Sequence, residues 1–178
     1  MYRISVGLGE RLLAMMLSFG GMLVDAAELP QTDGMMVFGA TADDSWDLYA
    51  WYGGERSRLV QLTDTAFDEK SPAISRDGKL VAFVDSAGEL RVLDLASGDE
   101  RVLAAGTHPG RWSSPSFCAD GSHLFCSYSE KGARDWSTLV VVDLASEQVE
   151  LPLSQYGPQY SPACAPAGSQ VIYGYAHC

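Results

Sequence analysis

Short apolar runs separated by turn residues fill most of the chain, and this pattern is typical of β-strands rather than helices. The run Leu80–Val84 is apolar at every position, so we expect a strand that is buried on both faces. The next run, Leu90–Leu95, alternates more and should lie farther from the core. Between apolar runs, Asp77-Gly78 is a strong hairpin signal. These features predict one four-stranded antiparallel unit, with strands at 72–75, 80–85, 89–94 and 100–104.

The same pattern recurs along the chain. A Ser-Pro pair opens the first strand of three units, at Ser71-Pro72, Ser114-Pro115 and Ser161-Pro162. An interval of about 45 residues between copies is typical of the blades of a β-propeller or the units of a solenoid. The strands predicted in the other units include 35–41, 46–51 and 58–63, then 122–128 and 138–143, and finally 161–165 and 170–175. The chain is therefore expected to hold units of three, four, four and two strands.

These units predict an all-β fold, a β-propeller made of four-stranded antiparallel blades. They span about residues 35–64, 65–106, 107–154 and 155–178. A closed propeller has about four to eight blades, whereas this chain holds a little over three, so the predicted propeller is incomplete. Open edges on the first and last units favour pairing with another chain. Two interpretations follow: a truncated chain, or self-association of two chains into one ring.

The N-terminal segment differs from the repeats. Arginines flank the start of an apolar stretch at residues 12–24, which is too short to span a bilayer as a helix. Small residues follow it. This order predicts a secretory signal peptide over residues 1–26, cut after Ala26 or Ala27, and a periplasmic or secreted protein of residues 27–178. The alternative is an N-terminal helix of a cytosolic protein.

Composition and charge narrow the range of partners. With 12 Lys and Arg against 23 Asp and Glu, the formal net charge is −11. Such a surface repels a phosphate backbone, so we expect no nucleic-acid binding. The hydrophobic content of 47% is ordinary for a globular protein. Because no second long apolar run follows the N-terminal stretch, no membrane span is predicted.

The second unit carries a recognisable motif. Leu62-Thr63 is followed by Ser71-Pro72, then by Asp77-Gly78-Lys79 and a hydrophobic strand that ends at Phe83. This order resembles the WD40-like repeat of the bacterial TolB family, whose usual pattern is Leu-Thr, a gap, Pro-x-Trp-Ser-Pro-Asp-Gly-Lys and a strand ending in Phe. The likeness covers about residues 35–175. The chain departs from the pattern at the usual Trp (Ile74, Phe117, Cys164), at a frequent Pro (Arg76, Ala119, Pro166) and at the Asp of the last copy (Ala167).

The resemblance implies a divergent TolB-like propeller that acts as a non-enzymatic protein-interaction scaffold in the cell envelope. It implies a protein partner, no cofactor and no catalysis. Similar repeats also form the propellers of prolyl-oligopeptidase-type peptidases and of some polysaccharide lyases. The alternative is therefore a propeller-domain fragment of such an enzyme, because a fold does not by itself define a function.

Motifs for catalysis or metal binding are weak. No Gly-x-Ser-x-Gly elbow is present, and the histidines lie at unrelated positions of the repeat, at His108, His123 and His177. Acidic residues cluster before two predicted strands, at Asp43, Asp44 and Asp47 and at Asp64, Asp68 and Glu69. Their spacing is not that of a calcium loop, so solvated turns are the favoured interpretation and a Ca²⁺ site is a hypothesis. We assign no catalytic, cofactor-binding or metal-binding residue.

The cysteines and tryptophans leave further alternatives open. The four cysteines are Cys118, Cys126, Cys164 and Cys178, and their disulfide pairing is left open. Pairing is allowed in an exported protein, whereas Cys164 aligns with Ile74 and Phe117 and also suits a buried apolar position. The tryptophans are Trp46, Trp51, Trp112 and Trp136. We favour packing between blades over carbohydrate binding for them.

Overall fold

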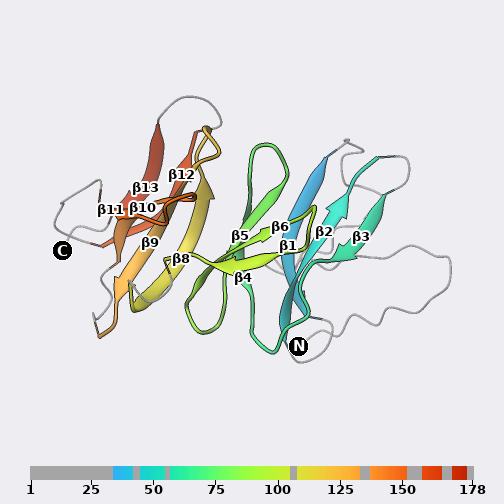
Figure 1. Cartoon of the computed structure of the whole chain (residues 1–178), viewed down its shortest axis with the longest axis horizontal. Coiled ribbons are helices and arrows are strands. Elements are labelled where there is room, and N and C mark those ends of the chain that lie inside the picture. The colour runs from blue at the N-terminus through green and yellow to red at the C-terminus, as the bar shows by residue number, and fades with distance from the viewer. Residues whose placement is uncertain are drawn as a thin grey trace.

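The computed structural model describes residues 34–41, 45–54, 57–104, 108–132, 137–151, 158–165 and 170–175. This part of the chain consists of β-strands and turns, with no helix among the described residues (Figure 1). It accordingly contains no helix long and apolar enough to cross a membrane. The predicted signal peptide at residues 1–26 lies outside the described residues.

The strands form four antiparallel sheets, and each sheet takes its strands in chain order. The first sheet holds β1 (Met35–Thr41), β2 (Trp46–Tyr52) and β3 (Arg58–Gln61). The second holds β4 (Lys70–Ile74), β5 (Leu80–Val84), β6 (Leu90–Asp94) and β7 (Glu100–Val102). The third holds β8 (Gly110–Phe117), β9 (His123–Glu130), β10 (Thr138–Asp143) and β11 (Val149–Glu150). The fourth holds β12 (Gln159–Cys164) and β13 (Val171–Tyr175).

The sheets follow one another across the molecule in chain order (Figure 1). The first strands of the last three sheets, β4, β8 and β12, contact one another in turn, and β1 contacts β4. Sheets that meet through their first strands, with later strands farther out, are the blades of a propeller. Among the described residues, the predicted all-β class and the units of three, four, four and two strands are confirmed, and these strands make up only part of a propeller.

Burial within the second sheet is greatest in its two middle strands, β5 and β6. In β5, Val81, Ala82 and Phe83 are fully buried, whereas in β7 only Val102 is even partly buried. The core lies between the sheets rather than within one of them. A large cluster joins the second and third sheets, and a smaller one, Leu48, Val81, Phe83 and Leu93, joins the first and second. Burial of Leu80–Val84 on both faces is confirmed. The predicted gradient is wrong for β6, which is mostly buried, and for the innermost strand β4, which has no buried residue.

Each Ser-Pro pair marks a β-bulge. In β4 the register places Lys70 opposite Val84 but Ala73 opposite Ala82, so one extra residue is inserted. The same insertion occurs in β8 and in β12. The serine of each pair adopts a left-handed backbone, with φ of 55° at Ser71, 50° at Ser114 and 48° at Ser161. The repeated motif therefore encodes a backbone irregularity, in which the extra residue bends the strand.

The bulge also explains where the first strands begin. The sequence predicts that they open at Pro72 and Ser161, because proline lacks the N–H that a ladder needs. The observed strands begin two residues earlier, at Lys70 and Gln159. Since proline is tolerated next to a bulge, the strand continues through the Ser-Pro pair. This boundary was wrong in the prediction, although the strand itself was expected.

The positive φ of Ser71 leads to a prediction for substitutions at this position. Replacing Ser71 with glycine is expected to leave stability unchanged or raise it by up to about 1 kcal/mol, because glycine has no Cβ to oppose a positive φ. Replacing it with valine should cost about 1–2 kcal/mol, since a β-branched side chain is strained there. Urea unfolding of both variants tests the difference. A valine variant as stable as the glycine variant would show that this serine does not require the left-handed backbone.

Backbone hydrogen bonds join consecutive sheets at one recurring place, two residues before each Ser-Pro pair. The N–H groups of Glu69, Trp112 and Gln159 donate to the carbonyls of Trp46 (2.7 Å), Gly88 (3.0 Å) and Ser137 (2.9 Å). The three donors are buried, although their side chains differ in chemistry. Each junction therefore depends on a main-chain contact that any non-proline residue can make.

Candidate interaction surface

In the second and third sheets, the turn between the first two strands and the turn between the last two strands lie at the same end of the sheet. The β4–β5 turn is joined to the β6–β7 turn by the bond from Leu95 N–H to the Lys79 carbonyl, at 2.9 Å. The β8–β9 turn is joined to the β10–β11 turn in the same way, from Leu144 N–H to the Ser122 carbonyl at 2.9 Å. This end of the molecule therefore presents a continuous, hydrogen-bonded set of turns.

The β4–β5 turn is held by Ser75. Its buried hydroxyl donates to Asp77 Oδ1 at 2.8 Å and accepts the N–H groups of Lys79 (3.2 Å) and Leu80 (2.9 Å). Gly78 completes the turn with φ of 71°, where a side chain would be strained. The Ser-x-Asp-Gly sequence therefore produces a well-defined turn rather than a flexible loop.

The β8–β9 turn reaches a similar shape by different contacts. Asp120 Oδ1 accepts the N–H groups of Ser122 (2.9 Å) and His123 (3.3 Å), and Gly121 has φ of 72°. Cys118 takes the place of Ser75 in the repeat and leads into this turn. The two Asp-Gly hairpins that the sequence predicts are confirmed.

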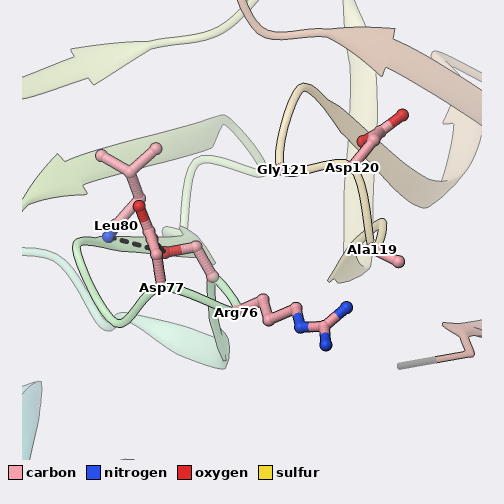
Figure 2. Close-up of a pocket in the computed structure, with 7 residues that line it drawn as sticks. Arg76, Asp77, Leu80, Ala119, Asp120 and Gly121 are labelled. Atoms are coloured by element: carbon pink, nitrogen blue, oxygen red, sulfur yellow. Dashed lines mark hydrogen bonds between the residues drawn. The ribbon is translucent and has the colours of Figure 1, made fainter. Parts of the chain in front are cut away.

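A pocket of about 360 Å³ lies between these two turns. Its lining comes from Ser75, Arg76, Asp77 and Leu80 on one side and from Ala119, Asp120 and Gly121 on the other. Figure 2 shows Arg76 reaching out from its own turn toward the side on which Ala119 lies, while the Asp120 carboxylate points away from it. The volume is at the lower end of the range for ligand sites. The pocket is a junction between two blades, formed by one turn from each.

Both acidic groups of the pocket are ionised at neutral pH. The Ser75 hydroxyl and the Lys79 N–H lower the pKa of Asp77. Burial acts to raise the pKa of Asp120, but the Ser122 N–H and the His123 ring outweigh it, so this pKa is also lowered. Because Arg76 also lines the pocket, the rim carries charges of both signs. Such a rim suits the side chains and main chain of a bound peptide better than an apolar ligand.

Sequence reasoning assigned no binding residue, so it missed every residue that lines this pocket. His123, named only among the scattered histidines, contacts the pocket residue Asp120 without lining the pocket. Its Nδ1 lies 2.7 Å from Asp120 Oδ2 and 2.9 Å from Ser122 Oγ, and its Nε2 lies 3.5 Å from Asp143 Oδ2. A serine triad needs the serine on one ring nitrogen and the carboxylate on the other. Here Asp120 and Ser122 share Nδ1, and the ring is 39% exposed. The arrangement joins the β8–β9 turn to the end of β10, whereas Lys79 and Asp77 of the preceding blade pair within a single turn.

The acidic cluster before Ser71 is used internally. Asp68 Oδ1 accepts the Trp46 N–H at 3.1 Å, and its other oxygen lies 3.3 Å from Lys70 Nζ. Glu69, 2% exposed, accepts hydrogen bonds from the hydroxyls of Thr63 and Thr65. Solvated turns were the favoured interpretation, and for Glu69 this was wrong, because the carboxylate packs at the junction of two blades.

The other acidic cluster lies only partly within the described residues. Asp43 and Asp44 are outside them, whereas Asp47 is buried and accepts hydrogen bonds from Gln61 Nε2 (3.3 Å) and the Thr65 N–H (3.4 Å). Within the described part of the chain, no group of three or more His, Cys, Asp or Glu side chains is arranged to hold a metal ion. The Ca²⁺ site stays a hypothesis.

The burial of Glu69 predicts a pH-dependent stability difference. Burial raises the pKa of Glu69, against the hydrogen bonds from Thr65 and Thr63. A raised carboxyl pKa stabilises the fold below the unfolded-state pKa, and that contribution is lost as pH rises through the folded-state pKa. Replacing Glu69 with Gln should therefore raise the unfolding free energy at pH 7 by on the order of 1 kcal/mol. The gain should shrink toward about pH 4, near the ordinary pKa of glutamate.

The matched control is Asp68→Asn. Hydrogen bonding to the Trp46 N–H and the contact with Lys70 lower the pKa of Asp68, so its contribution is present at neutral pH and lost as pH falls. This variant should therefore be less stable than the natural chain at pH 7. Urea unfolding of both variants at a series of pH values measures the two trends. A Glu69→Gln variant that is less stable at every pH would contradict the prediction.

The aromatic and cysteine predictions have mixed outcomes. Trp112 is 5% exposed and belongs to the cluster that joins the second and third sheets, so packing between blades is confirmed there. Trp46 is 46% exposed, and for this residue the prediction of packing between blades is wrong.

The cysteines differ in their burial. Cys164, predicted to suit a buried position, is only partly buried, whereas Cys126 is fully buried. Three further residues of these predictions lie outside the described part of the chain: Trp136, His177 and Cys178.

The fold and the turns define a β-propeller, and comparison with solved structures agrees. A protein assigned as TolB from Agrobacterium tumefaciens superposes with a TM-score of 0.63 at 19% identity, over 80% of this chain and 50% of that one. Oligogalacturonate lyase from Vibrio parahaemolyticus gives 0.65 at 18% identity, over 80% and 42%. TolB from Acinetobacter baumannii gives 0.50 at 21%, over 66% and 29%.

These likenesses show a divergent TolB-like propeller fold. The chain spans half or less of the length of the solved proteins that it matches. No family model matches the sequence, and no curated protein matches it. At such identities the shared property is the architecture, which unrelated activities use.

Proposed function

We propose that the protein is a non-enzymatic TolB-like interaction module of the cell envelope, which binds a protein partner at the pocket between the β4–β5 and β8–β9 turns. The observation that carries the proposal is the pocket itself. Two adjacent blades each contribute a well-defined Asp-Gly turn, and the lining includes the Arg76 side chain and two ionised carboxylates, Asp77 and Asp120. An extended peptide segment carries groups that complement such a rim, in its amide groups and its charged side chains.

The arrangement of His123 supports a non-enzymatic role. Its ring is bracketed by two carboxylates and is exposed, whereas a catalytic base needs a free nitrogen directed at a substrate. The envelope location is supported by the predicted signal peptide and by the TolB structures among the similar folds.

If the protein is exported, the mature chain recovered from the periplasm should begin at Ala27 or Glu28.

Site-specific photo-crosslinking in the producing cell tests the pocket. A photoreactive residue at Ala119 should give a discrete adduct with one protein. The matched control is the same residue at Phe67, which is exposed and precedes β4 at the opposite end of that strand. The captured protein, once purified, should bind the natural chain directly. The Arg76→Glu variant should bind it at least about tenfold more weakly, because that change reverses a rim charge.

Two results would overturn the proposal. One is the same adducts from both positions, which would indicate nonspecific proximity. The other is unchanged affinity of the Arg76→Glu variant, which would place the contact elsewhere.

A second candidate function rests on the likeness to oligogalacturonate lyase, which superposes over 80% of this chain. In this alternative, the chain is part of the propeller of a polysaccharide lyase. Incubation with oligogalacturonate tests it, because elimination produces an unsaturated sugar that absorbs in the ultraviolet. Turnover by the purified chain would favour the lyase and contradict the non-enzymatic module.

A further inference from the structure

Two cysteines from neighbouring blades meet at the edge of the third and fourth sheets. Cys118 directly follows β8, and Cys164 is the last residue of β12. Their Sγ atoms lie 2.9 Å apart, although 46 positions separate them in the chain. The pairing left open by the sequence therefore has one pair that the fold brings into contact.

The backbone around the two thiols holds them in place. The Cys164 N–H donates to Ser116 Oγ at 3.1 Å, and β8 and β12 are in contact along the junction. A disulfide has an S–S distance of about 2.0 Å, so bond formation requires the two sulfur atoms to approach by less than about 1 Å.

We propose that Cys118 and Cys164 are a cross-linking site, at which a disulfide joins the third and fourth blades. The oxidant is a disulfide-containing molecule, either a small one or a thiol–disulfide oxidoreductase. One cysteine thiolate attacks a sulfur of that disulfide, forms a mixed disulfide and releases one thiol. The second cysteine then attacks its partner's sulfur in the mixed disulfide and releases the second thiol. The chain loses two electrons and two protons, and the oxidant gains them as two thiols.

Cys126 is excluded as a partner by its position. It is fully buried within β9, in the cluster that fills the space between the second and third sheets. An external oxidant reaches Cys118 and Cys164, which are both partly exposed. Burial and the contact with Cys164 raise the pKa of Cys118, so oxidation of the folded chain should be faster at alkaline pH.

The cross-link would fasten the sheet that has the fewest strands. The fourth sheet consists of β12 and β13 alone among the described residues, and Ile172 on β13 is 78% exposed. A disulfide that closes a long loop restricts the unfolded chain strongly. It would therefore raise the thermal stability of the fold at the junction of the third and fourth sheets.

The test uses the full chain, reduced and then incubated with oxidised glutathione at about pH 8.5, near the ordinary pKa of a cysteine thiol. After the remaining thiols are alkylated, non-reducing peptide mapping should find one linked pair, Cys118 with Cys164. Cys126 should be alkylated only after unfolding. The oxidised chain should melt about 5–15 °C above the reduced chain.

Serine variants separate the cross-link from other effects of oxidation. Cys118→Ser should abolish both the linked peptide and the melting shift, and serine already occupies the equivalent position at Ser75. Cys178→Ser should retain both. If Cys118→Ser does not fold, Cys164→Ser and the mapping of the natural chain still decide the question. Four free thiols after oxidation, or a linked pair that includes Cys126 or Cys178, would overturn the proposal.

Discussion

Replacing Phe83 with alanine is expected to lower the unfolding free energy by about 3–5 kcal/mol. Phe83 is the largest fully buried side chain among the described residues, and it packs with Leu48, Val81 and Leu93 between the first two sheets. Truncation removes apolar contacts and leaves a cavity that strands on both sides are too rigid to fill. Because typical domains have only 5–15 kcal/mol of stability, much of the variant should unfold or aggregate.

Phe67→Ala is the matched control, since it removes the same side chain from a position that is 46% exposed. It should change the unfolding free energy by no more than about 1 kcal/mol. Urea unfolding followed by tryptophan fluorescence measures both variants. Equal losses at the two positions would show that the smaller cluster does not join the first two sheets.

The second large effect is expected at Gly110, the first residue of β8. A Cβ there would meet the Ser129 carbonyl oxygen and lie 2.6 Å from the ring of Tyr128. That ring also packs on Trp112 and His108, so it has little room to move. Gly110→Ala should therefore cost about 3 kcal/mol through overpacking.

Gly39→Ala provides the comparison, because it is also a strand glycine without a positive φ. Its added Cβ would find only ordinary contacts, the nearest being the Glu69 carbonyl oxygen at 3.5 Å. This variant should match the natural chain or exceed its stability by about 0.5–1 kcal/mol, because alanine loses less backbone entropy on folding. Thermal unfolding distinguishes the two glycines. A Gly110→Ala variant as stable as Gly39→Ala would mean that β8 and β9 can separate at their ends without cost.

The architecture could be predicted from the sequence because its signals are local. The apolar run Leu80–Val84 and the pair Asp77-Gly78 each fix a strand or a turn within a few residues. The strand Thr138–Asp143 is observed with the boundaries that were predicted. The repetition strengthened the fold prediction, because one interpretation of the Ser-Pro motif had to fit three copies.

Contacts between blades could not be predicted in the same way. The meeting of Cys118 with Cys164 depends on how two sheets pack, and no local pattern encodes that distance. Glu69 looked like a solvated turn residue because its neighbours are acidic, yet the packing of two blades buries it. The pocket likewise needs one turn from each of two blades, so it exists only in the assembled fold.

The main-chain bonds at the blade junctions have a consequence for how such chains lengthen. Because Glu69, Trp112 and Gln159 all donate a backbone N–H to the preceding sheet, each junction tolerates a change of side chain. A unit cut at these positions begins with its own donor and contains its own acceptor, as Glu69 and the Gly88 carbonyl do in the second unit. Duplication of one such unit in the gene would therefore insert a complete blade with compatible ends, in the manner of repeat proteins whose units interact with their nearest neighbours. The junctions make the number of blades an evolutionary variable that is independent of the surface chemistry of each blade.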